Sequence, residues 1–148
     1  MSAPALLSVT DLRVGFATEG GLLQAVDGVS FDLIPGEVLA IVGESGSGKS
    51  ATAQTILGLT RSPNARISGS VKLGDAELID AGDAELREVR GERIGMVFQD
   101  PMTSFNPVYR LGDQIVEAIR AHRGDVSKAE ARARAVELMG LVGIASGP

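Results

Sequence analysis

Residues 43–50 combine the residue types that hold a chain of phosphates. Their letters, GESGSGKS, fit the pattern G-x-x-x-x-G-K-[ST] without a mismatch. Glycines let such a loop curl so that several backbone N–H groups point inward, and the N-terminus of the following helix adds partial positive charge. Lys49 supplies a full charge for the outer phosphates, and the Ser50 hydroxyl can coordinate Mg²⁺. The stretch therefore predicts a P-loop that binds a nucleotide.

The candidate nucleotide-contacting residues are the loop itself and the residue after it. They are Gly43, Glu44, Ser45, Gly46, Ser47, Gly48, Lys49, Ser50 and Ala51. A Gly/Ser-rich turn that precedes Lys-Ser by chance is the alternative interpretation. The flanks favour the P-loop, because EVLAIVG at 37–43 has the pattern of a buried strand and residues 48–59 that of a helix.

The elements that position this loop follow from the hydrophobic pattern. Residues 6–16 and 24–33 alternate around a glycine turn and predict a hairpin, with a bulge at Gly28. After the P-loop helix, the pattern predicts short strands and turns at 65–75, a charged helix at 83–90, a buried strand at 93–98 and a loop from 99 to 110. The order predicts an α/β fold with a parallel part and an antiparallel addition.

Two helices are predicted at the C-terminal end, as a separate helical patch. The first places apolar side chains and the single histidine on one face: Leu111, Ile115, Ala118, Ile119 and His122. The second begins with a capping-box pattern, Ser127 to Glu130, and closes at Gly140. A surface or packing role is expected for His122, because no catalytic partner is in view.

Composition excludes several classes of protein. The 148 residues suit one domain or a piece of a larger one, and 44% are hydrophobic, which is enough for a core. The formal net charge of −5 shows no basic excess, so no nucleic-acid partner is expected, and the Arg87, Arg90 and Arg93 cluster is interpreted as a solvated helix face. The absence of cysteine excludes disulfides and thiol chemistry within the chain. No apolar run approaches the ~18 residues of a membrane-spanning helix.

Residues 96–115, MVFQDPMTSFNPVYRLGDQI, narrow the class of nucleotide-binding protein. Together with VGESGSGKS and VDGVSFDLIPGEVLAIVG, they closely resemble the ATP-binding subunits of ABC transporters. The likeness is greatest to the group that serves dipeptide, oligopeptide and nickel importers. It implies a P-loop NTPase core, residues 1–99, with a parallel sheet and an antiparallel β addition, followed at 100–148 by the Q-loop region and the first part of a helical subdomain.

The resemblance also implies roles for single residues. Gln99 matches the Q-loop glutamine, which contacts Mg²⁺ and the attacking water, so Gln99 and Lys49 become the candidate catalytic residues and Ser50 and Gln99 the candidate Mg²⁺ ligands. Phe16 matches an aromatic residue that stacks on adenine; a strand residue packed in the core is the alternative. Asp100 follows the apolar run GMVF but comes after Gln99 and before a proline, so it is rejected as the acidic Mg²⁺ ligand of the family.

The family also needs a signature loop, a strand that ends in Asp-Glu and a switch histidine, and none of these occurs within the 148 residues. The chain is therefore expected to be the N-terminal portion of an importer ATPase that hydrolyses ATP barely or not at all by itself, with exposed sheet edges. A non-catalytic nucleotide-binding fragment is the alternative, and another P-loop enzyme such as a small-molecule kinase ranks below both. The implied cofactors are ATP and Mg²⁺. The implied partners are permease subunits, which contact the region after Gln99, and a second ATPase subunit, at the cytoplasmic face of the membrane.

Overall fold

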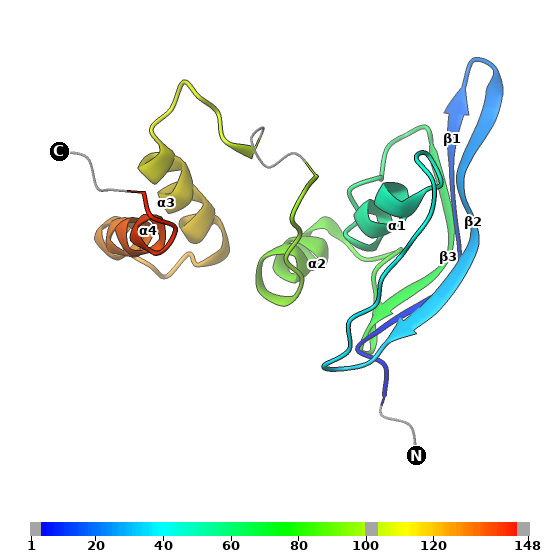
Figure 1. Ribbon diagram of the computed structural model, residues 1–148, viewed down its shortest axis with the longest axis horizontal. Coiled ribbons are helices and arrows are strands. Elements are labelled where there is room, and N and C mark those ends of the chain that lie inside the picture. Colours follow the sequence, from blue (N-terminus) through cyan, green and yellow to red (C-terminus); the bar gives the residue numbers. More distant parts are fainter. Residues whose placement is uncertain (1–3, 100–103, 145–148) are drawn as a thin grey trace. The chain divides into compact units, whose positions relative to one another are not determined.

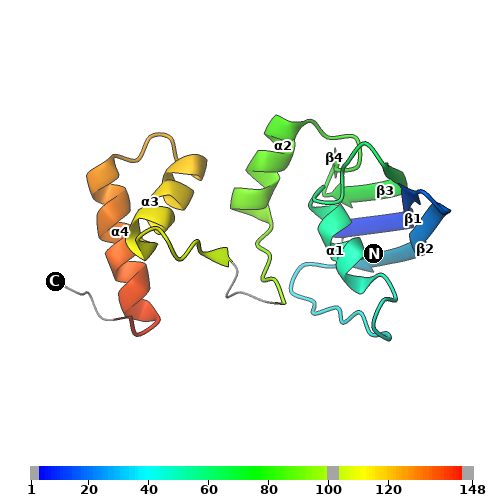
Figure 2. The ribbon, with the colours of Figure 1, turned by 90° about the horizontal axis from the view of Figure 1, so that it is seen from above.

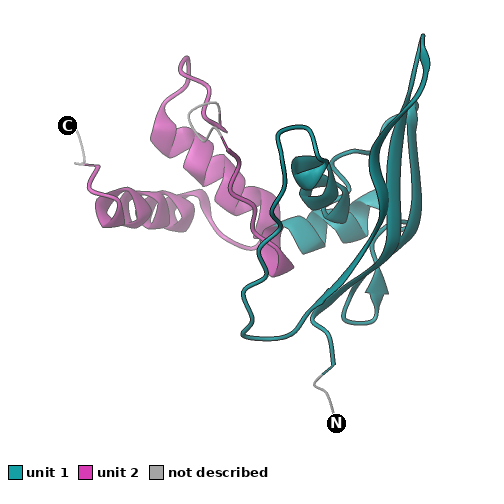
Figure 3. Ribbon diagram, turned by 45° about the vertical axis from the view of Figure 1, so that its right-hand side comes forward, with its two compact units in different colours: residues 1–90 teal, residues 91–148 magenta. Residues whose placement is uncertain are grey.

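The computed structural model describes residues 4–99 and 104–144. Contacts between Cα atoms divide the chain into two compact units, Met1–Arg90 and Gly91–Pro148 (Figure 3). The first unit contains a sheet and two helices, and the second contains a helical pair.

The sheet of the first unit has four strands in the order β2-β1-β3-β4, and every pairing is antiparallel. β1 (Leu7–Thr18) and β2 (Gly21–Leu33) form the predicted hairpin around a turn at residues 19–20. β3 (Ala65–Leu73) is one continuous strand where short strands were predicted, and β4 (Ala76–Glu77) pairs with its end. The bulge predicted at Gly28 is confirmed, because this glycine has no partner in β1 and a φ of 73°.

Two helices lie on the same side of this sheet, with α1 next to the strands (Figures 1 and 2). α1 (Lys49–Ile56) confirms the predicted P-loop helix, and α2 (Asp83–Glu88) continues into a π-helical turn, Val89–Arg93. The strands and helices bury a common apolar layer that includes Leu7, Val9, Leu12, Val14, Val26, Ile56, Val71, Leu73, Leu86 and Val89. The alternation of buried side chains along the strands and the position of the helices therefore indicate the same core face of the sheet.

The two strands predicted for the parallel part are not formed. Residues 37–43 and 94–98 have no strand assignment, and residue 93 belongs to the π-helical turn. Most of their side chains are open to solvent: Val38 is 95% exposed, Val42 92% and Val97 90%. Parallel strands of this kind are stable when both faces are covered and a neighbouring strand completes the ladder. Within the described residues neither segment has such a neighbouring strand. The apolar pattern of the two segments therefore predicted buried strands that are not formed.

The second unit consists of α3 (Leu111–His122) and α4 (Lys128–Leu141). The predicted capping box is confirmed: the Ser127 hydroxyl accepts from the Glu130 N–H, and the Glu130 carboxylate accepts from the Ser127 N–H. The Ser127 hydroxyl and N–H donate to the Glu130 carboxylate at 2.6 and 3.0 Å, and these two hydrogen bonds lower the pKa of Glu130. The buried centre of the pair is Val116 with Ala131 and Ala135.

The predicted face of α3 is correct in part. Ile115 and Ile119 pack against the core of the helical pair, whereas Ala118 and His122 are exposed. Val116, which the predicted stripe left out, is the most buried residue of the helix. The His122 ring lies against Gly91, where a Cβ would meet Nδ1 at 2.1 Å, which agrees with a packing role.

The Glu77 carboxylate joins β3 to β4. Its oxygens accept from the Ser70 hydroxyl at 2.5 Å and from the N–H groups of Val71 and Ile79 at 2.9 and 3.1 Å. Partial burial raises the pKa of Glu77, but these hydrogen bonds and the charge of Lys72 outweigh it and hold the pKa below the ordinary value of 4.5.

A depressed carboxyl pKa contributes stability that is fully present above the unfolded-state value and is lost as the pH falls through the folded-state value. We expect Glu77→Gln to lower the free energy of unfolding by about 1 kcal/mol at pH 7, and the difference from the parent to shrink as the pH falls below 4.5. Urea unfolding at pH 7 and pH 3 measures both, with the exposed Glu19→Gln as a matched control. A difference that does not change with pH would contradict this role.

Candidate nucleotide-binding site

The P-loop curls back on itself between the exposed segment 37–43 and the start of α1. Gly46 and Gly48 have φ values of 82° and 88°, in the left-handed region that glycine adopts without strain. The Ser47 N–H donates to the Glu44 carbonyl at 3.2 Å and closes the turn. The glycines of the motif therefore serve the loop's shape.

The ammonium group of Lys49 lies inside this curl. Its Nζ donates to the carbonyl oxygens of Gly43 at 2.7 Å and Glu44 at 2.6 Å, and to the Ser47 hydroxyl at 3.3 Å. The side chain is half-buried, whereas residues 43–47 are exposed. A full positive charge is thus held where the loop opens to solvent.

Two glycines leave no space for a side chain. A Cβ at Gly43 would lie 2.6 Å from the Ser47 hydroxyl oxygen, and one at Gly48 would lie 2.2 Å from the Ala25 carbonyl oxygen of β2. Gly48, the last glycine of the loop, therefore packs directly against the backbone of β2. Sequence reasoning missed Ala25, because a contact made through a backbone carbonyl leaves no signal in residue type.

The N-terminus of α1 is open to an anion. Its N-cap residue, Gly48, provides no side-chain cap, and the first turn contains no acidic residue. Backbone N–H groups at a helix start are unsatisfied unless capped, and with the helix dipole they favour negative charge. The loop, the helix start and the Lys49 ammonium together fit a phosphate chain.

The described residues contain no group of three acidic, histidine or cysteine side chains that could hold a metal ion. Ser50 lies exposed on the first turn of α1, where its hydroxyl can serve as one oxygen ligand. A magnesium ion here would rely on phosphate oxygens for most of its coordination, which is the usual arrangement for Mg²⁺ with nucleotides.

The remaining predicted residues lie in different places. Phe16 is half-buried near the end of β1, paired with Leu23 of β2 and Ala65 of β3. Gln99 is exposed at a bend in the second unit, whereas Phe16 and the P-loop belong to the first. Asp100 lies outside the described residues.

Two arginines to which the sequence assigned no structural role donate to backbone carbonyls near α1. Arg61 donates to three backbone carbonyls, those of Leu78, Ile79 and Ala81, at 2.5 to 2.8 Å. Arg90, from the cluster interpreted as a solvated face, donates through Nε to the Leu57 carbonyl at 2.7 Å, just after the helix. Neither contact has a sequence signature.

A glycine-rich loop that opens a helix packed against a sheet is typical of nucleotide-binding α/β proteins. The chain belongs to the ABC transporter family, whose model matches residues 26–146. Among curated relatives, the oligopeptide transport ATP-binding protein OppD of Mycobacterium tuberculosis is 53% identical over 139 residues, which are 94% of this chain and 22% of that protein. The dipeptide transport ATP-binding protein DppD of Bacillus subtilis is 48% identical over 140 residues, 94% of this chain and 42% of that protein. The chain thus spans roughly a fifth to two fifths of the length of these relatives.

Solved structures confirm the α/β class of the fold. The ATP-binding cassette MJ0796, in a dimeric post-hydrolysis state bound to ADP and Pi, matches with a TM-score of 0.73 and 26% identity over 91% of this chain and 56% of that one. A second dimeric structure of MJ0796, described as a bacterial ABC transporter cassette, gives a TM-score of 0.74 with the same identity and coverage. The family resemblance drawn from the motifs is therefore confirmed.

Among the helices of residues 4–99 and 104–144, none has the length and apolar character needed to cross a bilayer.

Proposed function

We propose that this chain supplies the nucleotide-binding portion of the ATP-binding subunit of an ABC importer for dipeptides or oligopeptides, with nickel as the alternative cargo. The observation that carries the proposal is the Lys49 ammonium held inside the curled loop at the uncapped start of α1. The names of the relatives, which are peptide transport ATP-binding proteins, support the cargo class.

In this proposal the phosphates of ATP lie against the loop and the start of α1, where backbone N–H groups and Lys49 neutralise their charge. Mg²⁺, when bound with the nucleotide, would neutralise further phosphate charge, and Ser50 and Gln99 are the residues that we assign to it. Lys49 and Gln99 are the catalytic candidates. Phe16 would stack on the adenine, an interaction worth about 1–3 kcal/mol.

Efficient phosphoryl transfer also needs groups that orient the attacking water and stabilise the developing charge. Of the proposed site residues, only Gln99 would contact that water. We therefore propose that the 148 residues alone turn over ATP barely or not at all, and that hydrolysis is an activity of the complete subunit.

The loop after Gln99 is the surface that we assign to the permease subunits. In its described part, residues 104–110, the side chains of Phe105, Val108 and Tyr109 are 48%, 83% and 67% exposed. The Gln114 amide donates to the carbonyls of Asn106 and Tyr109, and so fixes the loop against α3. Exposed apolar side chains on a segment that hydrogen bonds hold in place, as at residues 104–110, suit docking to a partner.

The dimeric MJ0796 structures support a second ATPase subunit as the other partner. We place the complex peripherally on the cytoplasmic face of the membrane. We also retain the division proposed from the sequence, with residues 1–99 as the ATP-binding core and 100–148 as the Q-loop region and helical subdomain.

Lys49→Ala tests the proposal. We expect Mg-ATP affinity, measured by isothermal titration calorimetry, to fall by roughly 10- to 100-fold, because a charged hydrogen-bond donor worth about 1.5–3 kcal/mol is removed from the phosphates. In the complete subunit, the same change should abolish dipeptide uptake by transporting cells, with nickel uptake measured in parallel. Lys128→Ala, which removes a lysine from the exposed start of α4, is the matched control. Unchanged Mg-ATP affinity in Lys49→Ala would remove the P-loop from the site.

A further inference from the structure

β1 contains one extra residue that pairs with neither of the two neighbouring strands, β2 and β3. Between Val9 and Leu12, β1 has two residues where β2 has one. Between Thr10 and Arg13, β1 likewise has two residues where β3 has one. Asp11 lies in both intervals and has a φ of 46°, the one positive φ of a non-glycine residue within residues 4–99 and 104–144. Asp11 is therefore the extra residue of a bulge that the central strand presents to both sides.

This bulge changes which residues of β1 face the core. Val9 is buried before it, and Leu12 and Val14 are buried after it, so the inward side chains change from odd to even numbers. Phe16 shares the even phase and so faces the same side as Leu12 and Val14. Because side chains alternate with a period of two, a β1 without the extra residue would turn Phe16 to the opposite face.

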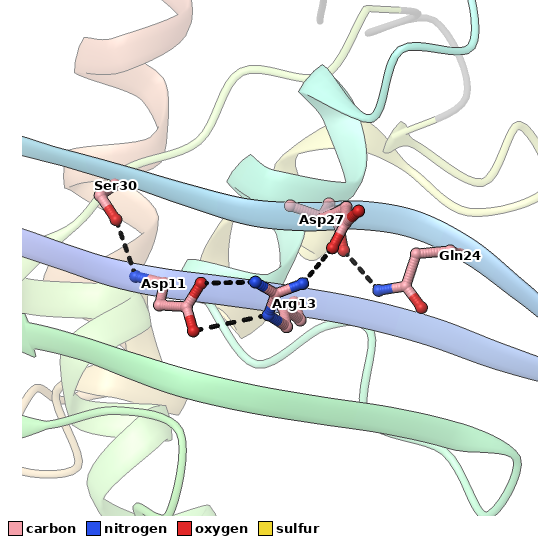
Figure 4. A network of polar contacts seen from close by, with 6 residues as sticks. Asp11, Arg13, Gln24, Asp27 and Ser30 are labelled. Carbon is pink, nitrogen blue, oxygen red and sulfur yellow. Dashed lines mark hydrogen bonds and ion pairs between the residues drawn. The ribbon is translucent and has the colours of Figure 1, made fainter.

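A cluster of charged side chains holds the bulge from the outer face of the sheet (Figure 4). The Arg13 guanidinium donates to the two Asp11 carboxylate oxygens, at 3.0 Å through Nη2 and 3.4 Å through Nε, and pairs through Nη1 with Asp27 of β2. The Asp11 N–H donates to the Ser30 hydroxyl of β2 at 2.8 Å. Arg13 thus ties the extra residue to the neighbouring strand; we call Asp11, Arg13 and Asp27 the Arg13 cluster.

Two glycines on the neighbouring strands leave room for this arrangement. A Cβ at Gly28 would lie 2.9 Å from Arg13 Nη2 and 3.0 Å from an Asp11 carboxylate oxygen. A Cβ at Gly69 would lie 2.4 Å from the Asp11 carbonyl oxygen. A glycine in each strand that flanks β1 therefore accommodates the bulge at Asp11.

The base platform and the phosphate loop are held by one stretch of the hairpin. Gly48 rests on the Ala25 carbonyl, and Leu23, two residues away in β2, pairs with Phe16. Only Gln24 separates Leu23 from Ala25, and Ala25 is itself an extra residue of β2, because Gln24 pairs with Gly15 and Val26 pairs with Val14. A register that fixes Phe16 relative to this part of β2 also fixes it relative to the P-loop.

We infer that the Arg13 cluster is a register lock for adenine recognition. By holding the extra residue at Asp11, it places Phe16 on the inner face beside the P-loop, so Arg13 is a positioning residue for the base. The inference rests on the proposed nucleotide-binding function and adds residues that never touch the nucleotide.

The test separates the base from the phosphates. Affinities for Mg-ATP and for Mg-tripolyphosphate, which lacks the base and the sugar, are measured by calorimetry. Loss of base stacking in Phe16→Ala corresponds to about a 5- to 150-fold loss of ATP affinity. We expect Arg13→Gln to weaken Mg-ATP binding by about 5- to 30-fold, the lower part of that range, and Mg-tripolyphosphate binding by less than about twofold. Arg13→Lys, which keeps the charge, should recover part of the loss.

Arg132→Gln is the matched control, because Arg132 forms an exposed ion pair with Asp113 in the second unit. Equal losses for both ligands in Arg13→Gln, or no loss for Mg-ATP, would overturn the register lock. If circular dichroism shows that Arg13→Gln does not fold, Asp11→Asn decides by the same criteria, because asparagine tolerates a positive φ. Tripolyphosphate binding that is insensitive to Lys49→Ala would instead overturn the proposed function.

Discussion

Gly48→Ala is expected to displace the P-loop and to destabilise the first unit by about 2–5 kcal/mol. An alanine at a φ of 88° costs about 1–2 kcal/mol. Its Cβ would also lie 2.2 Å from the Ala25 carbonyl oxygen, and relieving an overlap with backbone costs about 1–3 kcal/mol more. Because the loop must move away from β2, Mg-ATP affinity should fall about 100-fold or more. Urea unfolding and calorimetry measure the two effects.

Gly36→Ala is the control for the backbone term. Gly36 has a similar φ of 82° but no atom within 4 Å of the Cβ position, and it lies outside the loop. This variant should lose only about 1–2 kcal/mol and keep its Mg-ATP affinity. Equal destabilisation by the two substitutions would mean that the close contact between Gly48 and the Ala25 carbonyl does not contribute to the cost of the Gly48 substitution.

Features that depend on local sequence could be predicted. The hairpin around residues 19–20 follows from alternation on both sides of a glycine turn, and α4 begins where the Ser127–Glu130 capping box places it. The P-loop was found because its glycines, Lys49 and Ser50 occur at a fixed spacing. In each case the determining interactions join residues a few positions apart.

Features that depend on partners distant in the sequence could not be predicted. Residues 37–43 and 93–98 have the composition of buried strands, but a strand forms only where a neighbour completes its ladder, and Val38 and Val97 are exposed instead. Asp11 could not be recognised as a bulge, because its cause lies in the register of β2 and β3. The predicted roles of Gln99 and Phe16 come from the family's motif positions and stay predictions.

Arg61→Met is expected to lower the free energy of unfolding by about 2–4 kcal/mol. The Arg61 guanidinium donates to the carbonyls of Leu78, Ile79 and Ala81, which link β4 to α2, and a hydrogen bond from a charged donor is worth about 1.5–3 kcal/mol without being additive. Methionine keeps the apolar stem but leaves the three carbonyls without this donor. Arg61→Lys offers a single point charge in place of a fork and should fall between the two. Chemical denaturation followed by circular dichroism measures the series.

Arg66→Met provides the comparison, because the Arg66 guanidinium also donates to backbone carbonyls but at 3.2 and 3.4 Å, on an exposed surface. Contacts this long and this open to water contribute little, so the change should stay within about 0.5 kcal/mol of the parent. If Arg61→Met were no more destabilising than Arg66→Met, water would be replacing the guanidinium at all three carbonyls. The stability of the segment from β4 to α2 would then rest on its buried apolar residues, Leu78, Ala81 and Leu86.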